Sequence, residues 1–148
     1  ATIIDAPGST KNVKKARDPE MHQIRKGNEW RFGMKCHVGV DAGSGLVHTV
    51  TVTSANKHDI TETVNLIRED DEVVYGDSGY LGVQKCSEIQ QNEHFSKVEH
   101  VFRMIKCQSG HRKVVYRGLK KNENRLYALF ACANLYSLAI AGRKLSTT

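Results

Sequence analysis

The chain has 148 residues, the size of one domain that can bury a hydrophobic core, and a formal net charge of +6. Its four cysteines form neither a CxxC pair nor a zinc-ribbon spacing, which predicts a reduced, cytoplasmic protein. We expect no apolar stretch to approach the ~20 residues that a membrane span requires, so no membrane partner is predicted.

The first third of the chain is predicted to contain the end of a strand, a loop and a β-hairpin. Residues 1–4 are mostly apolar and read as the tail of a strand, whereas residues 9–28 are polar and basic without a sustained period, which predicts a long surface loop. Trp30 to Val40 alternates in polarity, and Leu46 to Thr53 is rich in β-branched residues. With a turn cluster between them, these segments predict a β-hairpin.

A helix and a buried strand are predicted next. Asp59 followed by Glu62 fits an N-cap with a capping-box acid, and the apolar positions of this helix should rest on the sheet. Those positions are Ile60, Val64, Leu66 and Ile67. Glu72 to Asp77 is an apolar run that predicts a buried strand ending at Gly76 and Asp77. Residues 81–91 are predicted to form a short helix or an irregular segment.

Two helices are predicted in the last third. Within Lys97 to Cys107, the charged residues Glu99, Arg103 and Lys106 recur at i, i+4 and i+7. Apolar residues occupy the other side, so this is an amphipathic helix whose charged stripe carries a single carboxylate. Residues 113–116 form a short extended candidate. Residues 122–138 are nearly apolar on all sides, which predicts a mostly buried helix that Gly142 ends.

Positive charge is concentrated between residues 103 and 125, where only Glu123 opposes eight cations. These are Arg103, Lys106, Arg112, Lys113, Arg117, Lys120, Lys121 and Arg125. Such a cluster attracts a polyanion through Coulomb steering and counterion release. The alternative is an ordinary solvated face.

Two carboxylates suggest metal-assisted chemistry on nucleic acid. Asp77 ends a predicted strand and Glu99 lies on a predicted helix. Two divalent cations held by carboxylates roughly 3.5 to 4 Å apart can activate a nucleophile and stabilise a leaving oxygen, and Mg²⁺ prefers such oxygen ligands. Considered singly, Asp77 is also explained as a turn residue, and Glu99 with Lys106 as a solvated helix face.

Three segments resemble bacterial insertion-sequence transposases of the DDE type, in the group that includes insertion sequence five. They are residues 2–12, 76–80 and 97–106, and the similarity covers nearly the whole chain. The resemblance implies an α/β, RNase H-like layered fold and three acids that hold Mg²⁺ or Mn²⁺ for DNA strand cleavage and transfer. Asp77 and Glu99 match the second and third acids, as catalytic residues and metal ligands, and Lys106 matches a basic residue that grips DNA.

The sequence departs from this family pattern in two places. The pattern puts the first acid immediately before Ala1, and Asp5, which stands further along the strand at a variable position of the pattern, is a poor substitute. Only 21 residues separate Asp77 from Glu99, where similar transposases have several dozen. Residues 1–148 are therefore predicted to be one partial, truncated transposase domain with an internal deletion near residue 96, and to be inactive.

The expected partners are DNA, both element ends and target, and a second copy or a full-length transposase. The residues expected to contact DNA are Lys106, Arg103, Arg112, Lys113, Arg117 and Lys120. A rival hypothesis is a noncatalytic fragment that binds DNA or transposase. A third is a reading frame that does not fold, because a deleted strand would expose an unpaired sheet edge.

Overall fold

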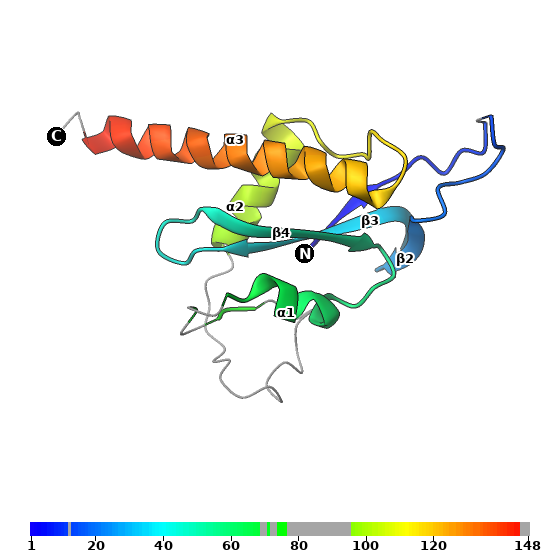
Figure 1. Ribbon diagram of the computed structural model, residues 1–148, viewed down its shortest axis with the longest axis horizontal. Helices are drawn as coiled ribbons and strands as arrows, with labels where there is room; N and C mark the ends of the chain where they lie inside the picture. Colours follow the sequence, from blue (N-terminus) through cyan, green and yellow to red (C-terminus); the bar gives the residue numbers. More distant parts are fainter. Residues whose placement is uncertain (12, 69–70, 72–73, 77–95, 146–148) are drawn as a thin grey trace.

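The computed structural model describes residues 1–148 except 12, 69–70, 72–73, 77–95 and 146–148. An antiparallel sheet lies at the centre of the described part, with α2 and α3 on one side and α1 on the other (Figure 1). The strands are β1 (Thr2–Asp5), β2 (His22–Lys26), β3 (Glu29–Val40) and β4 (Val47–Ser54). The helical segments are η1 (Asp59–Glu62), α1 (Thr63–Leu66), α2 (Ser96–Arg103), the π-helix η4 (Met104–Gln108) and α3 (Leu119–Leu145). This arrangement agrees with the predicted α/β class.

The sheet is organised around β3, which pairs antiparallel with the other three strands. Met34 pairs with Ile4 of β1 and with Ser54 of β4, so β3 lies between these two strands at that point. The predicted hairpin is confirmed, because β4 follows β3 and pairs with it from Met34 to Val40, with one irregularity between Gly39 and Val40.

Two expectations about strands are corrected. The predicted loop over residues 9–28 contains β2, whose residues are exposed apart from the half-buried Ile24; a strand without a buried face leaves no apolar alternation to read. A strand is also predicted at residues 72–77. Residues 74–76 are not in a strand, and residues 72, 73 and 77 lie outside the described part. The extended candidate at residues 113–116 is reduced to a single parallel bridge between Lys113 and Asp5.

The predicted helix after β4 is present but short, and its predicted N-cap is wrong. The N-cap of η1 is His58, and it makes no side-chain capping bond. The Asp59 carboxylate instead accepts a hydrogen bond from Lys35 Nζ at 2.8 Å, which removes it from the helix end. Val64 is 84% exposed rather than resting on the sheet.

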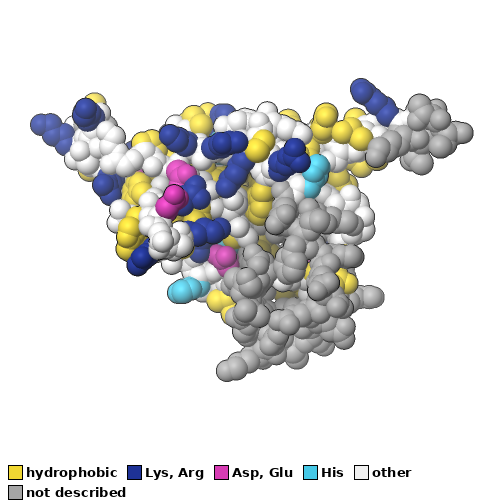
Figure 2. Space-filling model, turned by 180° about the vertical axis from the view of Figure 1, so that it is seen from behind, with side chains coloured by type: hydrophobic (Ala, Val, Ile, Leu, Met, Phe, Trp, Pro, Cys, Tyr) yellow, Lys and Arg dark blue, Asp and Glu magenta, His cyan; other side chains and the backbone are white. Residues whose placement is uncertain are grey.

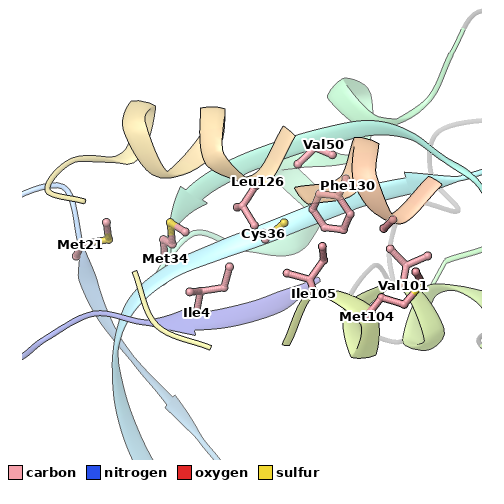
Figure 3. Close-up of a cluster of buried hydrophobic side chains, with 11 residues drawn as sticks. Ile4, Met21, Met34, Cys36, Val50, Val101, Met104, Ile105, Leu126 and Phe130 are labelled. Carbon is pink, nitrogen blue, oxygen red and sulfur yellow. The ribbon is translucent and has the colours of Figure 1, made fainter. Parts of the chain in front are cut away.

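The amphipathic helix predicted over Lys97 to Cys107 is confirmed, as α2 followed directly by η4. Val101, Met104 and Ile105 point into the hydrophobic core. Figure 3 shows them beside side chains from β1, β3, β4 and α3. The other labelled core residues are Ile4, Met21, Met34, Cys36, Val50, Leu126 and Phe130. The predicted residues 81–91 lie outside the described part.

The expectation of a mostly buried last helix is wrong. One stripe of α3 faces the core through Leu126, Phe130 and Ala133, while Leu135 is 67% exposed and Tyr136 is 54% exposed. The sheet covers only one side of α3, and the C-terminal part of the helix extends past the sheet (Figure 1). The helix also continues through Gly142, since one Gly in a helix costs only about 1 kcal/mol relative to Ala.

This helix also corrects the expectation about membrane spans. Residues 119–143 of α3 form one helix that is long and apolar enough to cross a membrane by length and composition alone. A core helix of a soluble protein passes the same test.

Side chains distant in sequence hold α3 in place. The backbone N–H of Gly118 donates to Asp18 Oδ2 at 2.6 Å, and that of Leu119 donates to Glu20 Oε2 at 2.7 Å. Carboxylates are favourable at this end because the helix dipole is positive there. Further along, the Asn134 side-chain amide bonds both the N–H and the C=O of Val47 on β4.

Candidate nucleic-acid interface

Lys106 connects η4 to the first residues of β1. Its Nζ donates a hydrogen bond to Thr2 Oγ1 at 2.6 Å. Thr2 pairs with Cys36 and Ile4 pairs with Met34, so both strand residues lie on the sheet face that α2 and α3 cover. The helical segment that carries the charged stripe therefore runs alongside β1.

The two predicted catalytic acids are not tested by this geometry. Asp77 lies outside the described residues, and Glu99 lies in α2 with its side chain outside the described part. Glu99 precedes Lys106 by seven residues, about 10 Å along an ideal helix axis, so its backbone belongs to the same helical segment beside the sheet.

Lys106 also lines a surface pocket of about 390 Å³ beside the last residue of β1. The pocket forms where the segment around Lys113 meets β1, with the N–H of Val114 donating to Asp5 O at 2.9 Å. Its lining residues are Asp5, Arg31, Lys106, Cys107, Arg112 and Lys113. Four cations and one carboxylate give this lining a formal charge of +3. We call it the β1-edge pocket.

Arg31 is a pocket residue that the sequence reasoning missed. Its guanidinium binds the Asp5 carboxylate through two hydrogen bonds, Nε to Oδ1 at 2.8 Å and Nη2 to Oδ2. This pairing with Asp5 raises the pKa of Arg31, which remains a cation. The one sequence signal for Arg31 is the alternation within Trp30 to Val40, which places Arg31 and Lys35 together on the polar side of that strand. Because Arg31 already binds both carboxylate oxygens of Asp5, this carboxylate is a poor ligand for a divalent cation.

The pKa of Lys106 is lowered, mainly because the ammonium is partly buried. Repulsion from Arg31 and Lys26 lowers this pKa further, whereas the Asp5 carboxylate raises it. The ammonium is thus held near more positive than negative charge. An anion in the pocket would favour the charged form of Lys106, because an opposite charge stabilises an ammonium. The Arg112 side chain lies beside it, donating from Nε to Lys106 O at 3.3 Å.

The predicted basic residues do not all converge. Lys106, Arg112 and Lys113 line the β1-edge pocket, whereas Arg103, Arg117 and Lys120 do not. Arg117 Nη2 donates to the Arg17 carbonyl oxygen at 3.3 Å, and Lys120 Nζ lies 3.6 Å from Glu123 Oε2. Figure 2 shows Lys and Arg side chains gathered across one face of the molecule. A second hollow of about 350 Å³ is lined by Tyr116, Lys121, Asn124 and Arg125.

Polar residues on the side of the sheet near α1 serve the fold. Lys35 Nζ donates to Lys57 O at 2.5 Å as well as to Asp59. His37 is fully buried, its Nε2 lies 3.0 Å from Thr53 Oγ1, and burial lowers the pKa of His37 to about 4, so its ring is neutral at pH 7. Within the described ranges, no group of three or more His, Cys, Asp and Glu could hold a metal ion.

The family described as Transposase DDE domain matches residues 1–95. The chain belongs to this family. The matched range holds all four strands, α1 and Asp77, and it ends before Glu99 and Lys106. DDE transposases act in DNA transposition, their substrate is DNA, and they generally use divalent metal ions. No solved structure matches the chain.

Proposed function

We propose that this chain is the DNA-binding core of a DDE transposase domain with an RNase H-like fold, and that the β1-edge pocket holds a backbone phosphate. The observation that carries the proposal is the convergence of Arg31, Lys106, Arg112 and Lys113 on one pocket beside β1. Asp77 and Glu99 are the proposed metal ligands, for Mg²⁺ or Mn²⁺. The proposed site of action is the cytoplasm, where a bacterial transposase reaches its DNA.

The charge of the pocket matches a phosphate better than a cation or an apolar ligand. The formal charge of the lining is +3 with the negative charge of Asp5 included, so the ion pair between Arg31 and Asp5 does not reduce it further. Lys and Arg contacts to phosphates release condensed counterions, so they supply affinity without sequence preference and make that affinity fall as salt rises.

Replacing Lys106, Arg112 and Lys113 together by Gln should weaken binding to duplex DNA by about 10²- to 10³-fold at about 0.1 M salt. The slope of log affinity against log salt should become shallower by about 3, roughly one unit for each lost phosphate contact. Fluorescence anisotropy with a labelled duplex across a salt series measures both quantities.

The control removes the same charge elsewhere. Lys11, Lys14 and Lys15 are exposed and lie in the segment before β2, outside the pocket. Their triple Gln variant should change the slope far less. Equal losses in the two variants would mean that net charge rather than the pocket binds DNA, and absence of duplex binding by the unmodified chain would refute the proposed function.

We also propose that the 148-residue polypeptide does not cleave DNA. Two features support this: only 21 residues separate Asp77 from Glu99, and the family match stops at residue 95, next to the proposed deletion. Two-metal chemistry depends on carboxylates held close together. With Mg²⁺ or Mn²⁺ and DNA bearing the element ends, we expect no nicking, and Asp77→Ala and Glu99→Ala should change nothing.

A variant with Asp added before Ala1 tests whether the shortened connection between Asp77 and Glu99 by itself prevents cleavage. If the shortened connection prevents catalysis, this variant should also be inactive. Metal-dependent nicking by the extended chain, lost again on Asp77→Ala, would show that the connection is not the defect. Nicking by the 148-residue chain itself would overturn the proposal directly.

A second candidate function is a noncatalytic fragment that binds a transposase, with a second copy of this chain as the simplest partner. The exposed apolar side chains of α3 favour it. They are Tyr127, Leu135, Tyr136, Leu138 and Ile140. Light scattering tests self-association, because a dimer has twice the 16.6 kDa monomer mass, and a chain that stays monomeric and binds duplex DNA would count against this second candidate.

A further inference from the structure

The β2–β3 hairpin presents Trp30, the only tryptophan of the chain, to solvent. Trp30 is 67% exposed, although a Trp ring offers a large area for burial. The other strand of the hairpin does not cover it, since β2 is itself exposed except for the half-buried Ile24. A large aromatic surface therefore remains available on an extended ribbon.

This exposure has no evident folding role. Phe32, two residues further along β3 and so on the same side of the strand, packs against the hydrophobic core and lies under the Arg17 guanidinium at 5.4 Å. Trp30 is not among the residues that form or flank that core in the described part of the chain. The core is thus completed by Phe32 without help from Trp30.

Trp30 has two cationic neighbours, Arg25 and Arg31, although Glu29 precedes it in β3. Arg25 pairs directly opposite Trp30 across the ribbon, which places their side chains on the same face. Arg31 follows Trp30 in the chain and lines the β1-edge pocket together with Lys106. The ring therefore has Arg25 on its own face, while the proposed phosphate site begins one residue further along β3, on the opposite face of that strand. A flexible anionic ligand with flat apolar groups would satisfy both features.

We propose that Trp30 stacks on an unpaired base of DNA while the adjacent β1-edge pocket holds the backbone of the same strand. This inference rests on the proposed DNA-binding function. Aromatic rings beside a basic groove bind single strands in this way, because every base offers a flat face and the groove follows the phosphates. Paired bases inside a duplex have their faces covered, so single-stranded DNA is the preferred ligand.

The single tryptophan makes the test direct. A single-stranded 15-mer should quench the intrinsic fluorescence of the unmodified chain on binding, and a duplex of the same sequence should quench it much less. Trp30→Ala should weaken single-strand binding about 10-fold, measured by anisotropy, with less than a roughly 2-fold effect on duplex binding. Trp30→Phe should retain part of the single-strand affinity.

Tyr136→Ala is the matched control, because Tyr136 is an exposed aromatic residue of α3, outside the hairpin. It should leave both affinities unchanged, and circular dichroism checks that each variant is folded. Single-strand binding without quenching, or an equal loss for both DNA forms on Trp30→Ala, overturns the stacking inference while the proposed function stands. Absence of binding to either DNA form refutes the proposed function itself.

Discussion

Replacing Gly33 by Ala should destabilise the fold by about 3 kcal/mol or more, the upper range for overpacking a closely packed site. A Cβ at Gly33 would lie 2.1 Å from Ile4 O, 3.0 Å from Ala6 N and 3.1 Å from the Asp5 Cα. All three atoms belong to the backbone, so no side-chain rotation can relieve the clash. The strand β1 would have to move away from β3, which separates Ile4 from the core.

Gly142→Ala is the matched control for this substitution. Gly142 lies in α3, and nothing within 4 Å would meet its Cβ. The same chemical change should therefore stabilise the chain by about 0.5 to 1 kcal/mol, because Ala loses less backbone entropy in a helix. Urea unfolding measures both variants. A Gly33→Ala variant as stable as the unmodified chain would show that β1 does not pack this closely against β3.

Asn122→Ala should cost about 3 kcal/mol, because one fully buried side chain ties down the turn before α3. Its Oδ1 accepts from the N–H groups of Val115 at 3.1 Å and Tyr116 at 3.2 Å. Its Nδ2 donates to the carbonyls of Tyr116 and Gly118, each at 2.7 Å. Removing the amide leaves four backbone groups without their partner, partly compensated by water because Val115 and Tyr116 are exposed.

The control is Asn124→Ala, since Asn124 is exposed on the same helix. It should change the free energy of unfolding by no more than about 0.5 kcal/mol. The turn held by Asn122 follows directly after Arg112 and Lys113, so Asn122→Ala should also weaken duplex binding. Similar unfolding midpoints for the two variants would contradict the assigned role of Asn122.

Local periodicity in the sequence was sufficient for several elements. The two-residue alternation of residues 30–40 and the β-branched residues that follow predicted the β3–β4 hairpin, which the structure contains. The spacing of Val101 and Ile105 predicted the buried side of α2 and η4. These signals work because a side chain's face within one strand or helix depends only on its position along that element.

The same local reasoning failed where burial depends on what lies opposite. The composition of α3 predicted a mostly buried helix, but the sheet reaches only the stripe of Leu126, Phe130 and Ala133. The strand β2 was read as a loop because neither of its faces is covered. In both cases the number of covered faces is a property of the whole fold.

The sequence by itself determined the family, the central hairpin, the amphipathic helix and the excess of positive charge; the roles of Asp77 and Glu99 stay predictions. The tertiary structure decided which cations share a pocket, that Arg31 is one of them, and that Trp30 is exposed. Lys106 reaches Thr2 across 104 positions of the chain, and Gly118 bonds Asp18 across 100. Contacts over such separations depend on how the helices pack against the sheet, so no periodicity within one element can reveal them.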